Sequence, residues 1–307
     1  MIVVLGALFP VFGVVVIGFI LKRMKFPGDT FWPYSDRLTY FVLFPALLIN
    51  KLSVANLNHP ELLPMMGVLF LAILAISVSV WLVKPLISWN NASYTSVLQG
   101  SIRPNTYIGL AGASALFGAD GLALTAVALA SVIPLVNVIS VLGFARWVPS
   151  HSPGASRVLR SILTNPLIVA SALGLVINFS GLGLPSAFIS LTEVIGRAAL
   201  PMGLLSVGAG LQIHTLRKYW GALTLSSLLK LVGLPLLAYA LGAYFLLEGL
   251  PLAIVVLYAS LPCSVSSYTL AAELGGDKIL VAAIITIQTL LAMLSIPLLL
   301  GGTVLWQ

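Results

Sequence analysis

Two short stretches of the sequence combine a proline with hydrogen-bonding side chains inside runs that are otherwise apolar. The first is Arg103-Pro104-Asn105-Thr106-Tyr107, and the second is Pro262-Cys263-Ser264-Val265-Ser266-Ser267. A guanidinium binds a carboxylate through two parallel hydrogen bonds, and amides and hydroxyls add uncharged donors beside it. These residue types therefore indicate a site for a small organic anion. The candidate contacts are Arg103, Pro104, Asn105, Thr106, Tyr107, Pro262, Cys263, Ser264, Ser266 and Ser267.

The same residues also have a purely structural interpretation. A proline inside a helix removes one backbone donor and clashes with the carbonyl four residues earlier, so the carbonyls near Gly100 and Tyr258 lose their usual partners. Arg103 can cap such carbonyls or pair with an acid, and Asn105 can satisfy the exposed backbone in the same way. Both interpretations stay open from the sequence.

The apolar runs around these stretches are long enough to cross a membrane. Of the 307 residues, 60% are hydrophobic and 7% are charged, whereas about 25% of the residues in a soluble domain are charged. A run of about 20 apolar residues spans a hydrocarbon core of about 30 Å. We expect ten spans, at residues 2–22, 33–50, 63–84, 93–117, 121–145, 158–179, 186–212, 219–246, 251–274 and 279–303. The expected fold class is an all-α polytopic membrane protein.

Pro104 and Pro262 interrupt the fourth and ninth spans near the middle of the membrane. Each lies about 11 residues into its span, so at 1.5 Å per residue both sit about 16 Å deep. Interrupted backbone is tolerated at that depth only where it packs within protein or lines a wet cavity, and secondary transporters bind their substrates at such breaks. We therefore predict broken helices four and nine that cross at the midplane.

The basic residues predict an orientation. The odd-numbered connections between spans hold ten Lys and Arg residues, and the even-numbered connections hold one. Cytoplasmic connections are enriched in these residues, so we expect both termini outside. Topology thus explains most of the net charge of +7, and no nucleic-acid partner is expected.

Prolines recur at nearly fixed separation in the two halves of the chain. Four pairs lie 156 or 158 residues apart: Pro10 with Pro166, Pro27 with Pro185, Pro45 with Pro201, and Pro104 with Pro262. This register indicates a duplication. Because each half holds five spans, the second half enters from the opposite side, which makes a 5+5 inverted repeat. We assign residues 1–146 to the first repeat, 147–156 to a cytoplasmic linker and 157–307 to the second repeat.

Four polar residues inside the spans are candidates for coupling to an ion. Glu193 and Arg197 lie four apart on one face of span seven, where they form either a self-compensating pair or a proton-coupling site. Lys230, midway through span eight, fits an ion pair with an unidentified acid and attraction of an anion equally well. Gln288 in span ten can face the crossing.

The sequence lacks the motifs of other function classes. The single cysteine, Cys263, allows no internal disulfide and no thiolate cluster. No nucleophile with a base and no metal-ligand spacing is present, so we expect no enzyme activity, no cofactor and no metal. His59, His151 and His214 fall in expected loops.

Four strings carry a family resemblance. They are Arg103-Pro104-Asn105-Thr106-Tyr107-Ile108-Gly109, Asn165-Pro166-Leu167-Ile168, the run 199–211, and the stretch from Leu261-Pro262 to Gly275-Gly276-Asp277. They resemble the bacterial, malonate-transporter-like branch of the auxin efflux carrier family, over the whole chain. The resemblance implies a scaffold of spans one, two, six and seven, a moving transport domain of spans three to five and eight to ten, and a homodimer through the scaffold. It also implies that Asn105 contacts a substrate carboxylate, whereas Cys263 and the serines replace a polar amide at the ninth span.

The leading hypothesis is a secondary transporter that moves a mono- or dicarboxylate across the plasma membrane, which in a bacterium is the inner membrane. In this hypothesis the two crossing helices move together as a unit. A sodium-coupled organic-anion symporter of the bile-acid type shares a crossover fold, but it needs hard oxygen ligands beside the break. Serines and Gln288 can contribute such ligands, and no acidic residue lies at the crossing itself. A membrane receptor that does not transport is the third hypothesis, which uptake into reconstituted vesicles separates from the first.

Overall fold

The computed structural model describes residues 2–55, 61–148, 160, 163–181, 183–212 and 219–303. Within these ranges the regular structure is helical, and the one extended feature is an isolated bridge between Pro104 and Cys263. The three histidines and residues 149–156 of the expected linker lie outside the described residues. The all-helical fold class expected from composition is therefore confirmed for the part of the chain that is described.

The first half of the chain forms helices α1 to α6. Their bounds are Ile2–Arg23 for α1, Phe31–Leu38 for α2, Thr39–Leu43 for the π-helical turn η1, Phe44–Ser53 for α3, Leu62–Val83 for α4, Lys84–Leu86 for the 3₁₀ turn η2, Asn91–Ile102 for α5 and Thr106–Trp147 for α6. Gly118 divides α6 into two helices, because its backbone (φ 63°, ψ −146°) is not helical. A glycine adopts this left-handed conformation at little steric cost.

The second half forms helices α8 to α15. Their bounds are Pro166–Ser180 for α8, Ser186–Arg197 for α9, Ala199–Ala209 for α10, Trp220–Leu228 for α11, Leu229–Gly233 for the π-helical turn η5, Leu234–Tyr244 for α12, Gly249–Ala259 for α13, Ser266–Leu274 for α14 and Lys278–Thr303 for α15. The turns η1 and η5 each end two residues before a proline, Pro45 and Pro235. A missing backbone donor at proline accounts for the local change in hydrogen bonding.

Six stretches of the described chain are long and apolar enough to cross a membrane. They are Ile2–Arg23, Leu62–Leu86, Thr106–Trp147, Ser186–Ala209, Trp220–Tyr244 and Lys278–Gly301. Of the other expected spans, the second and ninth are divided among shorter helices, the fourth is divided between α5 and the start of α6, and the sixth contains the single shorter helix α8. The chain is thus a multi-pass membrane protein, and the count of ten spans and the inverted repeat remain proposals.

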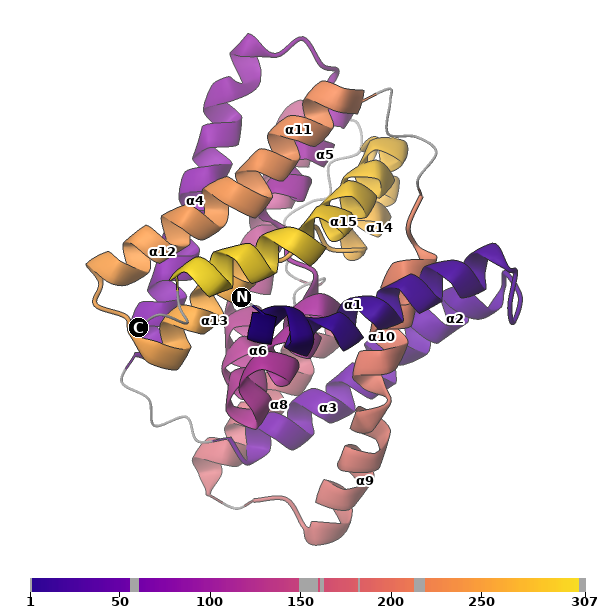
Figure 1. The fold of residues 1–307 in the computed structure, drawn as a ribbon, viewed down its shortest axis with the longest axis vertical. Coiled ribbons are helices and arrows are strands. Elements are labelled where there is room, and N and C mark those ends of the chain that lie inside the picture. The colour runs from indigo at the N-terminus through magenta and orange to yellow at the C-terminus, as the bar shows by residue number, and fades with distance from the viewer. Residues whose placement is uncertain are drawn as a thin grey trace.

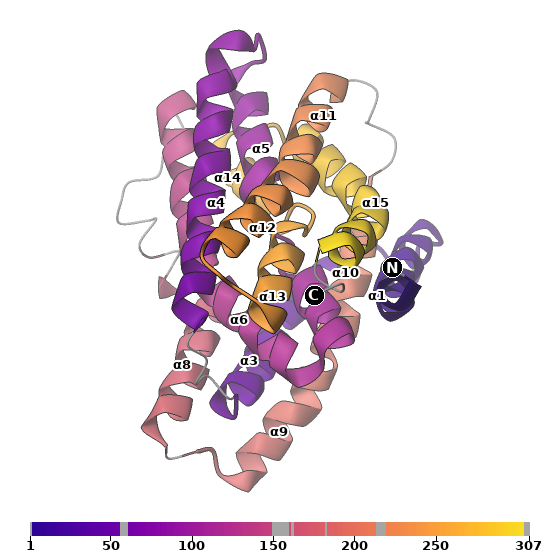
Figure 2. The same cartoon turned by 60° about the vertical axis from the view of Figure 1, so that its left-hand side comes forward.

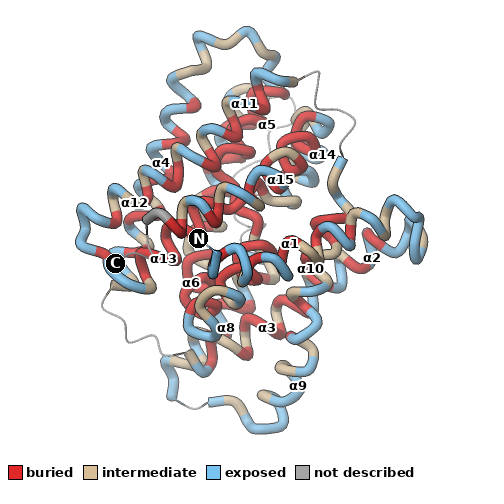
Figure 3. Tube along the Cα trace, viewed as in Figure 1, coloured by how far each residue is buried: buried red, intermediate tan, exposed pale blue. Residues whose placement is uncertain are grey.

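The helices pack in two groups around α6. In one group α1 packs on α10, and α3 packs on α8 and α9; in the other, α4, α5, α11, α12, α13 and α15 pack together. In Figures 1 and 2, α3, α8 and α9 of the first group lie in the lower part, α4, α5 and α11 of the second group lie in the upper part, and α1, α10 and α13 lie between them. Buried residues are concentrated along α5, α6 and α13 (Figure 3), so the core lies where the two groups meet.

Glycines set the close contact between α1 and α10. A Cβ atom at Gly208 would lie 1.9 Å from the carbonyl oxygen of Val15, and one at Gly18 would lie 2.2 Å from that of Leu205. Small residues at helix contacts let backbones approach, which is a common way to join helices in membranes. The first group is therefore joined by backbone contact as well as by side chains.

Candidate functional site

Two interrupted segments meet at the centre of the molecule. The first interruption is Arg103-Pro104-Asn105 between α5 and α6, with Arg103 and Asn105 in extended conformation. The second runs from Ser260 to Val265 between α13 and α14. The Asn105 N–H donates to the Pro262 carbonyl at 2.8 Å, and the Ser264 N–H donates to the Arg103 carbonyl at 3.2 Å. The two breaks therefore satisfy part of each other's backbone.

Gln288 of α15 joins both breaks through its side-chain amide. Its Nε2 donates to the Gly100 carbonyl at 3.0 Å and to Ser226 Oγ at 3.0 Å, while its Oε1 accepts from the Cys263 N–H at 2.8 Å. The carbonyl of Gly100 is one of those expected to lose its partner four residues before a proline. Gln288 thus replaces a backbone partner lost at each break.

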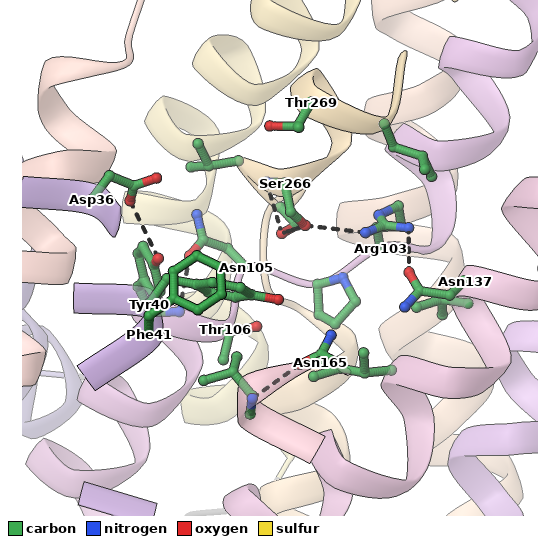
Figure 4. A pocket seen from close by; sticks show the side chains of 18 of the residues that line it. Asp36, Tyr40, Phe41, Arg103, Asn105, Thr106, Asn137, Asn165, Ser266 and Thr269 are labelled. Carbon is green, nitrogen blue, oxygen red and sulfur yellow. Dashed lines mark hydrogen bonds between the residues drawn. The ribbon is translucent and has the colours of Figure 1, made fainter. Parts of the chain in front are cut away.

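A cavity of about 420 Å³ opens beside the breaks. Seven of the candidate residues from the sequence line it: Arg103, Pro104, Asn105, Thr106, Tyr107, Ser264 and Ser266. Figure 4 shows Ser266 and Asn137 on either side of the Arg103 guanidinium, with Asn105, Thr106 and Asn165 nearby. The volume falls in the range of sites for small molecules.

Arg103 is a buried cation with no counter-ion among the described residues. It is 7% exposed, its Nη1 donates to Asn137 Oδ1 at 2.7 Å, and its Nη2 donates to Ser266 Oγ at 3.0 Å. Its Nε–H has no protein acceptor. The ion pairs found within the described ranges join Lys22 to Asp29 and Arg197 to Glu193. A charge in the membrane interior is costly without a partner, so the cavity favours an anion.

Two helix N-termini add to this preference. Asn105 caps α6, since its Oδ1 accepts from the N–H groups of Tyr107 and Ile108 at 3.1 and 3.2 Å. Asn165 caps α8 in the same way, accepting from Leu167 at 3.0 Å and from Ile168 at 3.3 Å. The N-terminal end of a helix carries partial positive charge and binds anions. Asn105 Nδ2 is also buried without a partner, which leaves one amide donor at the cavity wall.

The opposite wall of the cavity carries charged and aromatic side chains, among them Asp36, Arg37 and Tyr40. Asp36 of α2 and Tyr40 of η1 line it, and Figure 4 shows Asp36 on the far side of the cavity from Arg103. Asp36 Oδ1 accepts from the Tyr107 hydroxyl at 3.3 Å, and the Tyr107 ring stacks on Phe44 with 4.7 Å between centroids. Helix α2 and the turn η1, which pack against α10 and α3 of the first helix group, therefore supply one wall of the cavity, and the breaks supply the other.

Three candidate residues lie in the contact between the breaks and do not line the cavity. Pro262 and Cys263 are buried there, and Ser267 Oγ lies 3.4 Å from the Cys263 thiol. Conversely, neither Asn137 nor Asp36 was among the site residues expected from the sequence, although both line the cavity. The signal for Asn137 was present, because it is an amide inside the otherwise apolar run 121–145. No pattern in the sequence indicated that Asp36 lies beside the breaks.

The coupling candidates fall into different environments. Glu193 and Arg197 form the expected i, i+4 ion pair at 2.8 Å, with side chains 42% and 75% exposed. Gln288 joins the breaks, as described above. Lys230 of η5 is fully buried, and its Nζ has no hydrogen-bond partner.

Comparison with known proteins shows similarity to membrane transport proteins. A sequence profile of the family described as "Membrane transport protein" matches residues 154–300. An uncharacterized transporter of Methanothermobacter thermautotrophicus is 25% identical over 289 residues, which cover 92% of this chain and 93% of the relative. The second half of the chain therefore resembles the membrane transport protein family, and the archaeal transporter is similar to this chain over nearly its whole length.

The family resemblance drawn from the sequence strings is thereby confirmed. The profile matches the second half of the chain, while the archaeal relative aligns with both halves. These similarities support a membrane transporter. The cavity beside the two breaks is the candidate place for its substrate.

Proposed function

We propose that this protein is a secondary transporter that moves a small organic anion, a mono- or dicarboxylate, through a site at the two breaks. The observation that carries the proposal is Arg103, a buried guanidinium that lines the cavity without a carboxylate partner in the described chain. A carboxylate in the cavity would supply the missing negative charge. Its oxygens would reach a guanidinium N–H and the Asn105 amide, and the ends of α6 and α8 would support the charge.

The proposed architecture has ten spans in a 5+5 inverted repeat, with both termini outside the bacterial inner membrane. In this proposal α1, α2, η1, α3, α8, α9 and α10, which correspond to spans one, two, six and seven, form the scaffold and dimer surface. The helices α4, α5, α6 and α11 to α15, which correspond to spans three to five and eight to ten, form the transport domain. The cavity supports this division, because Asp36 and Tyr40 come from the scaffold side while Arg103 and Ser266 belong to the breaks. Sliding of the transport domain would carry a bound carboxylate past the Asp36 wall in an elevator-like step.

A paired ligand screen tests the binding part of the proposal. Purified protein is heated with acetate, lactate, malonate or succinate, and with the matching neutral amides. We expect carboxylates to raise the melting temperature, because a ligand that binds the folded state stabilises it, and we expect the amides to have no effect. Equal stabilisation by acids and amides would contradict the proposed role of charge.

Counterflow separates a transporter from a receptor. Vesicles that contain the protein and unlabelled malonate are diluted into labelled malonate, and a transporter exchanges the two pools. Binding without exchange would contradict transport of malonate by this protein.

A further inference from the structure

Lys230 is a buried amine that the proposed substrate site does not use. It lies in the π-helical turn η5 between α11 and α12, and it is 0% exposed. Its Nζ has no hydrogen-bond partner, and the residue does not line the cavity. It therefore cannot contact an anion held beside Arg103. π-helical turns inside α-helices are frequent at functional sites.

The helices around Lys230 carry no carboxylate. Four elements pack against η5, namely α5, α11, α12 and α15, and none of their residues is Asp or Glu. Their ionisable side chains are Tyr94 on α5, Tyr239 and Tyr244 on α12, and Lys278 at the start of α15. The buried thiol of Cys263, at the second break, is a further titratable group in this part of the protein. None of these groups is a fixed negative charge that could neutralise an ammonium.

A short chain of contacts connects η5 to the two breaks. Ser226 lies about one helical turn before Lys230, and its Oγ accepts from Gln288 Nε2 at 3.0 Å. The same amide of Gln288 contacts the Gly100 carbonyl and the Cys263 N–H. The helix that carries Lys230 is therefore hydrogen-bonded to the residue that joins both breaks. A shift of this helix would therefore displace Gln288 and, through it, the two breaks that line the substrate site.

We propose that Lys230 is the proton-coupling site of the transport cycle. In this step, the Nζ lone pair takes up one proton when the transport domain exposes Lys230 to water on one side of the membrane. Lys230 releases that proton when the transport domain exposes it to water on the other side. The enclosed arrangement seen here offers an ammonium neither an acceptor nor a counter-charge, so it stabilises the charged form less than a wetted arrangement does. Protonation of Lys230 therefore favours the wetted arrangement over the enclosed one. This inference rests on the proposed function, because it adds a coupling ion to that transport cycle.

The test compares Lys230→Met with Lys278→Met in vesicles, using labelled malonate as the probe. Lys278 is exposed at the start of α15, so the control removes the same charge from a solvated position. We expect Lys230→Met to keep malonate counterflow and to lose at least tenfold in accumulation driven by a pH gradient. Lys278→Met should keep both activities. Accumulation by Lys230→Met at the wild-type level would overturn the proposal.

A second measurement separates this inference from the proposed function. If wild-type protein neither exchanges nor accumulates malonate, transport of that dicarboxylate fails, and the proton site is then tested on purified protein alone. The melting temperatures of wild type, Lys230→Met and Lys278→Met are recorded across the neutral pH range. We expect the wild type and Lys278→Met to share a pH-dependent component that Lys230→Met lacks. Three superimposable profiles would refute a proton site at Lys230.

Discussion

Replacing Arg103 should separate charge recognition from folding. Arg103→Ala removes the cation that lines the cavity, together with its bonds to Asn137 and Ser266. Arg103→Lys keeps the charge but loses the planar fork that matches a carboxylate. The two variants therefore divide the contribution of Arg103 into charge and geometry.

The magnitude follows from the contacts that remain available to a ligand. Two of the guanidinium nitrogens already donate to protein oxygens, which leaves the Nε–H and the remaining Nη hydrogens for a carboxylate. Hydrogen bonds to charged groups contribute about 1.5–3 kcal/mol. A loss of about 3 kcal/mol in Arg103→Ala weakens malonate binding about 100-fold, since 1.4 kcal/mol is about tenfold. Arg103→Lys should lose about tenfold.

Calorimetry with malonate and with malonamide measures this effect directly. We expect the loss to be confined to malonate, because the diamide carries no charge. The melting temperature of Arg103→Ala should stay within about 4 °C of wild type, because the lost hydrogen bonds are offset by removal of a buried, unpaired charge. A folded Arg103→Ala protein that binds malonate with wild-type affinity would refute the role assigned to Arg103.

Two further substitutions test the structural basis of the site. Gln288→Leu should lower the free energy of unfolding by about 2–6 kcal/mol. The substitution leaves the Gly100 carbonyl and the Cys263 N–H buried without partners, at a cost of about 1–3 kcal/mol each. An unchanged melting temperature would show that these groups find other partners. Gly208→Ala should destabilise the contact of α10 with α1 by about 1–3 kcal/mol or more. Gly67→Ala should not lower stability in this way, because an added Cβ atom there meets open space. Equal melting temperatures for the two variants would contradict close backbone packing between α10 and α1.

The sequence predicted the features that depend on local covalent chemistry. A proline removes its own hydrogen-bond donor wherever it stands in a helix, so Pro104 and the orphaned Gly100 carbonyl could be recognised directly. The spacing of four residues between Glu193 and Arg197 likewise fixes their ion pair on one helix face. Such features need no knowledge of the tertiary fold.

The remaining parts of the site depend on packing between distant helices. Asn137 reaches Arg103 from 34 residues away, and Asp36 contacts Tyr107 from 71 residues away. The sequence also could not tell which residues of the second break face the cavity, because that choice depends on how the break packs against its partner. Cys263 faces the contact, while Ser266 faces the cavity.

The most direct measurement of the central claim is an experimental structure of the protein with malonate bound. The account predicts a malonate carboxylate within hydrogen-bonding distance of the Arg103 guanidinium and of the Asn105 amide, between the two breaks. Malonate bound elsewhere, with the cavity beside Arg103 holding no anion, would contradict it.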